Sequence, residues 1–243
     1  MTLLRGAELA AAFDDGARAY DRLVALNPGY HSQLRRSARR LGLTGGGAGR
    51  RVLDLGCGTG ASTAALVSVL PRAEVVGIDA SAGMLERARS KPWPRTVTFV
   101  RATVEDLSAG VVDGPFDVVF AAYVFRNVAD PDAALHTVHQ LLVPGGRIAV
   151  HDYTLSGRCV DRVVWTVVYR TVVLPLGSLT GDRRLYRHLR HSVDTFDTAP
   201  AFGDRLRRSG FDQVRVLPLP GWQTGITHTF LGRRPERETD GDS

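Results

Sequence analysis

The sequence predicts a doubly wound α/β fold, in which helices cover both faces of a mainly parallel sheet. Short apolar runs alternate with helical segments from residue 51 to residue 153. A glycine-rich stretch, GCGTG at 56–60, directly follows the first apolar run. The length of 243 residues and the 44% hydrophobic content allow one sizeable core, which excludes a long repeat array.

The N-terminal segment predicts helices that precede the sheet. Residues 7–41 have helical periodicity, which the sequence NPG at 27–29 interrupts. The spacer TGGGAG at 44–49 marks a boundary. We therefore expect an N-terminal helical cap over 1–45 and an α/β core over 46–157.

Five runs in the core predict strands, and the segments between them predict helices. The helices are expected over about 61–70, 81–90 and 131–142. Asp130 precedes Pro131 and is a suitable N-cap, while PGG at 144–146 is expected to end that helix before the fifth strand. The expected strands are RVLDL, VVGID, VTFVRA, DVVFAAY and RIAVHDY.

A helical insertion over 158–195 is expected after the fifth strand, followed over 196–243 by a last helix and a closing hairpin, FDQVRVLPL with GITHTFLGRR. The longest apolar stretch, 163–176, is shorter than the roughly 20 residues that span a bilayer. Because its apolar residues run nearly all round a helix, protein or an apolar ligand must cover it. Core packing and a lid over a ligand both remain open.

Charge and cysteine content exclude several functions. The net charge is +6, but Lys91 is the only lysine and the arginine pairs are scattered over separate segments. Solvated helix faces explain this distribution better than nucleic-acid binding. Cys57 and Cys159 lie far apart and the N-terminus lacks a charged-then-apolar signal, so we expect a reducing cytoplasmic compartment and no disulfide.

The glycine loop predicts a cofactor. Gly56, Gly58 and Gly60 leave the backbone bare after the first strand, although a tight turn alone would also use them. Asp79 ends the second strand, 19 residues after Gly60, where a carboxylate can accept ribose hydroxyls. A pyrophosphate would want the third glycine one residue later and would gain nothing from Asp54. S-adenosylmethionine, which is cationic, fits better than NAD.

Four motifs resemble those of the class I S-adenosylmethionine-dependent methyltransferases, which have a Rossmann-like sheet: VLDLGCGTG, GIDASAGML, VTFVRATVEDL and LLVPGGRIAV. A narrower resemblance comes from VFRNVADPDAALHTVHQLLVPGG, from YRHLRHSV at 186–193 and from FDDGARAYD at 13–21. These segments are similar to the C-methyltransferases of ubiquinone and menaquinone biosynthesis.

The resemblance implies that Thr59, Asp79, the Thr103–Val104 pair and Ala122 line the cofactor. Met84 would pack against the adenine or ribose or would only fill the core, and Tyr20 would close over the methionine end or would only pack. The full expected set is Tyr20, Asp54, Gly56, Gly58, Thr59, Gly60, Asp79, Ala80, Met84, Thr103, Val104 and Ala122.

Two positions depart from the family pattern. Family members usually carry Asp or Asn in place of Thr103, to bind the adenine amino group, and commonly Ser in place of Ala122. Adenine binding here would therefore lean on the backbone, with Glu105 or Asp106 as substitutes.

Arg126 and Asn127 follow the fourth strand and match the RN signature of the quinone family. Because arginine stays protonated, Arg126 would stabilise a phenolate or organise a water, and Asn127 would orient that group. A purely structural alternative is an ion pair from Arg126 to Asp130 or Asp132.

His151 ends the fifth strand, and it acts as a local base or is structural; the same choice holds for His228. Only Asp152 is well placed as an oxygen ligand, so no metal is expected.

The sequence thus predicts methyl transfer from S-adenosylmethionine to a small apolar acceptor, with a ring carbon of a prenylated quinol favoured. A natural-product O-, N- or C-methyltransferase, or a cofactor-binding protein without methyl transfer, stays open. So do contact with the inner face of a membrane and a homodimer. Nucleic acid is not an expected partner.

Overall fold

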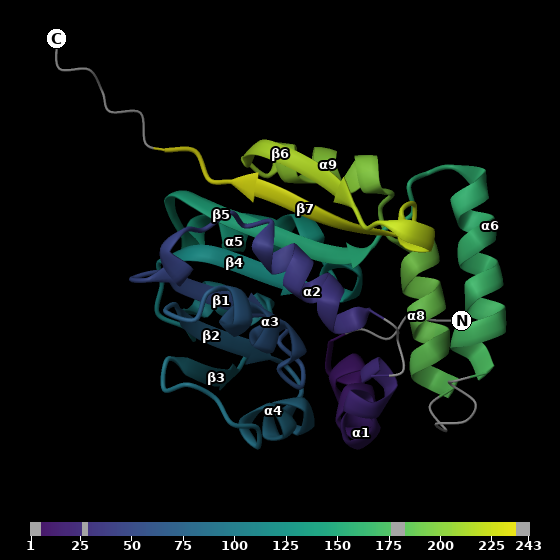
Figure 1. Cartoon of the computed structure of the whole chain (residues 1–243), viewed down its shortest axis with the longest axis horizontal. Helices are drawn as coiled ribbons and strands as arrows, with labels where there is room; N and C mark the ends of the chain where they lie inside the picture. Colours follow the sequence, from purple (N-terminus) through teal and green to yellow (C-terminus); the bar gives the residue numbers. More distant parts are fainter. Residues whose placement is uncertain (1–5, 26–28, 176–182, 237–243) are drawn as a thin grey trace, which may run out of the picture.

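The computed structural model describes residues 6–25, 29–175 and 183–236, which build one seven-stranded sheet of order β3-β2-β1-β4-β5-β7-β6 (Figure 1). Neighbouring strands from β3 to β5 are parallel, and β7 is antiparallel to both β5 and β6. The predicted doubly wound α/β fold is therefore confirmed, with the closing hairpin at one edge. The strands are β1 (Arg51–Leu55), β2 (Glu74–Asp79), β3 (Val97–Arg101), β4 (Phe116–Ala122), β5 (Leu142–Tyr153), β6 (Asp212–Pro218) and β7 (Thr227–Arg233).

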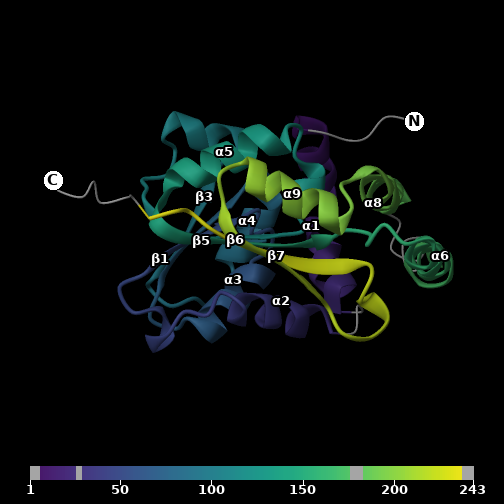
Figure 2. The ribbon, with the colours of Figure 1, turned by 90° about the horizontal axis from the view of Figure 1, so that it is seen from above.

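Helices cover both faces of the sheet, as Figure 2 shows with α2 and α3 below it and α5 and α9 above it. In Figure 1, α6 and α8 stand side by side beyond one end of the strands. The helices are α1 (Gly6–Ala25), α2 (Tyr30–Arg39), α3 (Ala61–Val69), α4 (Ala82–Arg89), α5 (Pro131–Leu141), α6 (Cys159–Val168), α8 (Arg183–Thr195) and α9 (Ala199–Arg208). The π-helical turn η4 (Tyr169–Val173) continues α6.

The central strands are apolar because both of their faces are covered. Val52, Leu53, Val118 and Phe120 are fully buried in β1 and β4. The two faces belong to separate core clusters, so successive side chains enter opposite layers. This packing holds the carboxyl ends of β1, β2 and β4 at one edge, where the ligand crevice of such sheets lies.

Both ends of α5 agree with the sequence, but the strand after it begins earlier than expected. The Asp130 side chain accepts hydrogen bonds from the backbone N–H groups of Asp132 and Ala133, as an N-cap does. We expected PGG at 144–146 to separate this helix from the fifth strand, but β5 begins at Leu142 and contains these residues. A register shift between Phe116 and Val118 accommodates the irregular segment within the ladder.

The inserted helix α6 has one buried and one exposed face. Trp165 and Tyr169 are buried against Leu155 and Val193, whereas Val163 is 60% exposed. In the described part of the chain no helix is long and apolar enough to cross a bilayer. The expected division of the chain at residues 45, 157 and 195 stays a prediction.

Candidate active site

A cavity of about 790 Å³ opens at the carboxyl ends of the parallel strands, beneath α1 and beside α6 and α8. It brings together residues that lie far apart in the sequence. The expected site residues that line it are Tyr20, Gly56, Gly58, Asp79, Ala80, Met84, Thr103, Val104, Ala122, Arg126 and Asn127.

The glycine loop connects β1 to α3 and leaves room for a ligand. Gly56 has φ +68°, and a Cβ there would lie 2.3 Å from Val124 Cγ2. Gly58 also has positive φ, lines the cavity, and a Cβ there would meet no atom within 4 Å. Glycine is thus required at Gly56 by crowding, and at Gly58 its missing side chain keeps cavity space free.

Asp79 joins the glycine loop to the end of β2. Its carboxylate accepts hydrogen bonds from the backbone N–H groups of Gly58 (2.8 Å) and Ser81 (2.9 Å). Burial raises the pKa of this carboxyl. Each oxygen keeps accepting capacity toward the cavity, because a carboxylate has about four lone-pair sites.

Asp54 lies one layer behind the loop and does not line the cavity. The hydroxyls of Ser62 and Thr63 both donate to its Oδ2, and its buried Oδ1 has no partner in the described structure. Burial raises the pKa of Asp54 to about 7. A nearby cation would favour the ionised form, so this orphaned oxygen fits the cationic cofactor that the loop predicts.

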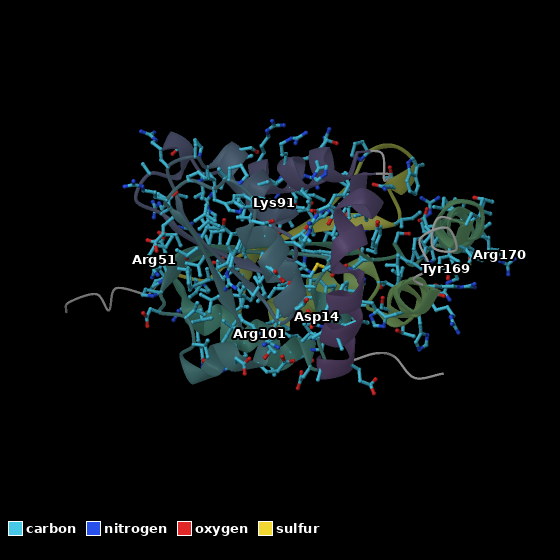
Figure 3. All side chains as sticks on the ribbon, turned by 90° about the horizontal axis from the view of Figure 1, so that it is seen from below. Asp14, Arg51, Lys91, Arg101, Tyr169 and Arg170 are labelled. Atoms are coloured by element: carbon cyan, nitrogen blue, oxygen red, sulfur yellow. The ribbon has the colours of Figure 1, made fainter. Side chains whose placement is uncertain are left out.

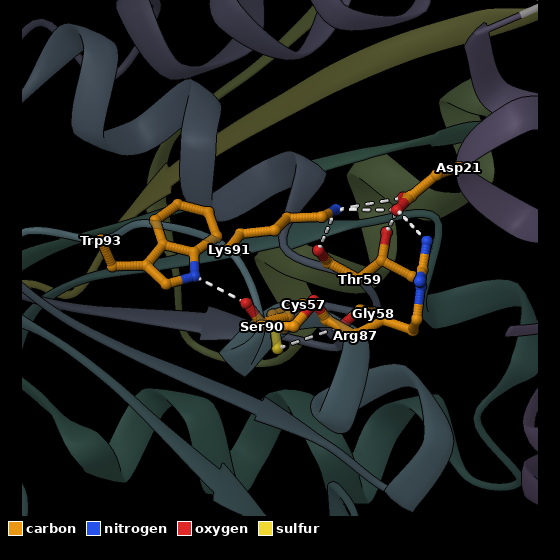
Figure 4. A network of polar contacts seen from close by, with 9 residues as sticks. Asp21, Cys57, Gly58, Thr59, Arg87, Ser90, Lys91 and Trp93 are labelled. Carbon is orange, nitrogen blue, oxygen red and sulfur yellow. Dashed lines mark hydrogen bonds and ion pairs between the residues drawn. The ribbon is translucent and has the colours of Figure 1, made fainter. Parts of the chain in front are cut away.

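Thr59 and Gly60 also lie outside the cavity lining, and Thr59 instead fastens α1 over the loop (Figure 4). The Thr59 hydroxyl donates to Oδ1 of Asp21 at 2.6 Å. The ammonium of Lys91 donates to Asp21 and to the Thr59 carbonyl oxygen. The single lysine of the chain therefore connects the N-terminal helix α1 to the glycine loop.

The loop after β3 closes on itself. The Thr103 N–H donates to the Asp106 carboxylate, and the Asp106 N–H donates to the Thr103 hydroxyl. These bonds lower the pKa of Asp106. Asp106 is thereby occupied within its own loop, whereas Glu105 lines the cavity. Of the two expected substitutes at the adenine end, the geometry favours Glu105.

Met84 and Tyr20, for which cofactor contact and simple packing were both expected, line the cavity. Met84 is buried in α4 and lines the wall next to Ser81. Tyr20 extends from α1, and its hydroxyl forms a hydrogen bond with that of Tyr30. Contact with a bound cofactor is thus open to both side chains, in addition to packing.

Arg126 lies in the turn η3 (Phe125–Asn127) after β4, and its partner is Asp152. The expected structural alternative, an ion pair to Asp130 or Asp132, is wrong. Nη1 of Arg126 lies 2.5 Å from Oδ1 of Asp152, and the two side chains are 9% and 0% exposed. The guanidinium also lies 5.6 Å from the ring centres of Tyr123 and Tyr153.

The Arg126 guanidinium has a buried donor without a partner. Its buried Nε has no hydrogen-bond partner among the described residues. A buried donor without a partner costs about 1–3 kcal/mol, and an oxygen-bearing ligand would remove that cost. Apart from His188, the lining toward α6 and α8 is apolar, namely Trp165, Val168, Val173, Leu189 and Trp222.

His151 lies behind the cavity wall and does not line it. It is fully buried, its Nε2 lies 3.2 Å from the Tyr123 hydroxyl, and its Nδ1 lies 3.3 Å from Oγ1 of Thr229. Burial lowers its pKa to about 3. His228 is bound in the same way to Thr154, 2.9 Å from the hydroxyl. This environment favours the structural interpretation of both histidines.

His188 is a cavity residue that was not predicted from the sequence. This side chain of α8 lines the cavity, and its Nε2 lies 3.0 Å from Oδ1 of Asn127. Its position in the segment YRHLRHSV was the only available signal. Among the described residues, no group of three or more His, Cys, Asp or Glu side chains could hold a metal ion.

Comparisons with known proteins agree with this geometry. Residues 52–146 match the family model described as a methyltransferase domain. The demethylmenaquinone methyltransferase of Thermus thermophilus is 34% identical over 224 residues, which cover 92% of this chain and 100% of that protein. The chain therefore belongs to the methyltransferase family that includes this relative. The ubiquinone/menaquinone biosynthesis C-methyltransferase of Syntrophotalea carbinolica is 33% identical, covering 94% of this chain and 95% of that protein.

Solved structures show the same fold at lower identity. The plantazolicin methyltransferase in complex with S-adenosylhomocysteine has a TM-score of 0.63 and 14% identity, over 93% of this chain and 95% of that one. Human N-acetylserotonin methyltransferase, in complex with S-adenosylmethionine, has a TM-score of 0.60 and 16% identity, over 93% and 56%. These structures share the predicted Rossmann-like fold of the class I methyltransferases. The cofactor of this methyltransferase is S-adenosylmethionine, as predicted and in agreement with the family to which the chain belongs.

Proposed function

We propose that this methyltransferase methylates a ring carbon of a prenylated hydroquinone. One observation carries the proposal: a single cavity runs from the predicted cofactor residues past Arg126 to an apolar wall built by α6, α8 and Trp222. The relatives named demethylmenaquinone methyltransferases support this choice of acceptor. The residues of the glycine loop, with Asp79, would hold S-adenosylmethionine, which supplies an electrophilic methyl group on its sulfonium.

The chemistry needs an electron-rich ring carbon in line with that methyl group. Loss of the hydroxyl proton to solvent raises the electron density of the ring and leaves negative charge on the oxygen. The ring carbon then takes the methyl group as the S–CH3 bond breaks and S-adenosylhomocysteine leaves. The hydrogen of that carbon is lost as the oxygen is reprotonated, so one proton is released overall. The Arg126 guanidinium, fixed by Asp152 and two tyrosine rings, lines the cavity and would face such an oxygen. A preorganised cation of this kind stabilises the phenolate without reorganisation.

The test is a rate series on quinols that differ only in prenyl number, at fixed detergent. Each buried methylene contributes roughly 0.8 kcal/mol, so kcat/KM should climb with tail length until the apolar part of the cavity is full. Val168→Asp, in the cavity wall, should flatten the climb, whereas Val167→Asp on the exposed face should leave it unchanged. The product should carry the new methyl on carbon, as NMR would show.

A flat series in the unaltered enzyme would reject the prenylated acceptor. It would favour a compact natural product, methylated on oxygen, nitrogen or carbon near Arg126.

The exposed face of α6 supports a second part of the proposal, contact with an anionic membrane surface. Val163 and Val167 project from this face, and Trp222 is 55% exposed at the rim of the same cavity. The turn that carries Trp222 abuts the start of α6, since a Cβ on Gly225 would lie 2.1 Å from Cγ of Asp161. Figure 3 shows Arg170 at the outer edge of the molecule, beyond Tyr169.

Exposed arginines border this apolar face and would complement acidic lipid headgroups; they are Arg158, Arg162 and Arg170. The acceptor's tail would then enter from lipid beside α6.

Co-sedimentation with vesicles tests this contact. The enzyme should bind phosphatidylglycerol vesicles and should bind phosphatidylcholine vesicles weakly. Val163→Ser/Val167→Ser should abolish binding without changing the rate on a short-chain quinol in detergent. If the unaltered enzyme ignores both vesicle types and instead dimerises, with the double variant monomeric by light scattering, the face binds a second copy and the membrane proposal fails.

A further inference from the structure

His188 connects the inserted helix α8 to the turn that carries Arg126 and Asn127. The residue is 7% exposed and lines the cavity. Its Nε2 lies 3.0 Å from Oδ1 of Asn127, and contacts between α8 and η3 accompany this bond. The acceptor side of the site therefore depends on a side chain from outside the sheet.

The direction of this hydrogen bond follows from the neighbours of Asn127. Nδ2 of Asn127 donates to the Tyr123 carbonyl oxygen at 3.2 Å, which turns Oδ1 toward His188. An amide oxygen only accepts, so Nε2 of His188 must carry the hydrogen. Nδ1 of His188 is buried without a partner in the described structure, so a hydrogen there would be unsatisfied.

The charge state agrees with this tautomer. Burial, together with the charges of Arg126 on η3 and His191 on α8, lowers the pKa of His188 to about 4. The ring is therefore neutral at physiological pH. A neutral ring with Nε2–H donates to Asn127 without adding a second positive charge beside Arg126.

The consequence concerns which polar group Asn127 can offer to a ligand. With Oδ1 bound to His188 and one Nδ2 hydrogen bound to Tyr123, the remaining group is the second N–H. A free amide could rotate by about 180° and present its oxygen instead, which would repel a developing phenolate.

We propose that His188 is a positioning residue that fixes the Asn127 amide as a hydrogen-bond donor to the acceptor's oxygen. This inference rests on the proposed function. It assigns α8 a part in completing the acceptor site, in addition to forming its wall.

The variants His188→Leu and His188→Gln test the role, because the Gln amide can donate where Nε2 does and the Leu side chain cannot. Leu should lower kcat at least tenfold with unchanged affinity for S-adenosylhomocysteine. Gln should restore kcat to within about threefold of the original value. His191→Gln, on the exposed face of the same helix, should change neither quantity.

If Leu retains full kcat, the positioning role is wrong. If Gln is as impaired as Leu while both fold, His188 acts as a base and the proposal is likewise overturned.

A measurement without acceptor separates this inference from the proposed function. In uniformly ¹⁵N-labelled protein, the imidazole signals that vanish in His188→Gln should show a neutral ring with Nε2–H between pH 6 and pH 8. That preference should weaken in Asn127→Leu, which lacks the amide oxygen. An Nδ1–H or charged ring would overturn the inference, whichever acceptors the enzyme methylates. Absence of turnover on every quinol would reject only the proposed function.

Discussion

Arg126→Met is expected to destabilise the enzyme by about 3–5 kcal/mol and to lower kcat by about 10²–10³. The stability loss follows because the variant leaves the fully buried Asp152 carboxylate without its cation. The rate loss follows if the guanidinium stabilises charge that develops on the acceptor's oxygen. Urea denaturation and steady-state kinetics on a prenylated quinol measure the two effects.

A double variant separates the two roles of Arg126. Arg126→Met/Asp152→Asn removes both charges and keeps an oxygen that can accept from the Tyr153 N–H, as Asp152 does at 2.9 Å. Most of the stability should return, because a buried pair adds little over a neutral replacement. The rate should stay low. Recovery of activity together with stability would show that Arg126 serves only the fold.

The local sequence was sufficient to predict that the glycine loop and Asp79 lie together at one edge of the sheet. The strand RVLDL, the three glycines and Asp79 lie within about 30 residues, and the parallel sheet necessarily brings β1 and β2 to one edge. The helix signals were equally local, as Asp130 before Pro131 shows. Most of the fold could therefore be predicted, because each element carries its own pattern.

The part of the cavity around Arg126, where we propose that the acceptor binds, depends on contacts between residues that are distant in sequence. Asp130 and Asp132 are near Arg126 in the chain, but β5 pairs with β4 so that His151 stands beside Ala122. This register places Asp152, 26 residues away, next to Arg126. Strand register therefore decides which of Asp152, Asp130 and Asp132 pairs with Arg126, and no short motif encodes that register.

The contacts of the inserted segment 158–195 could not be predicted from local sequence either. Its apolar residues run nearly all round the helix, so periodicity alone did not distinguish Val168 in the cavity wall from Val167 on the exposed face. The contact of His188 with Asn127 could not be predicted either, because it depends on how α8 packs against η3. Docking of a whole helix is decided by tertiary packing and has no counterpart in local sequence.

Asp79→Ala is expected to weaken cofactor binding by at least tenfold. The carboxylate lines the cavity and is predicted to accept the two ribose hydroxyls, and each charge-assisted bond contributes about 1.5–3 kcal/mol. The variant also removes the acceptor for the Gly58 and Ser81 N–H groups, which loosens the glycine loop itself. Titration calorimetry with S-adenosylhomocysteine measures the change in Kd.

Glu74→Ala is the matched control for Asp79→Ala, because Glu74 is an exposed carboxylate at the opposite end of the same strand, β2. Its partner is Arg51, at 3.5 Å, and surface pairs of this kind contribute little. This control should bind S-adenosylhomocysteine as the unaltered enzyme does. Unchanged affinity in Asp79→Ala would mean that the ribose is held elsewhere, and Glu105, which also lines the cavity, would be the next carboxylate to replace.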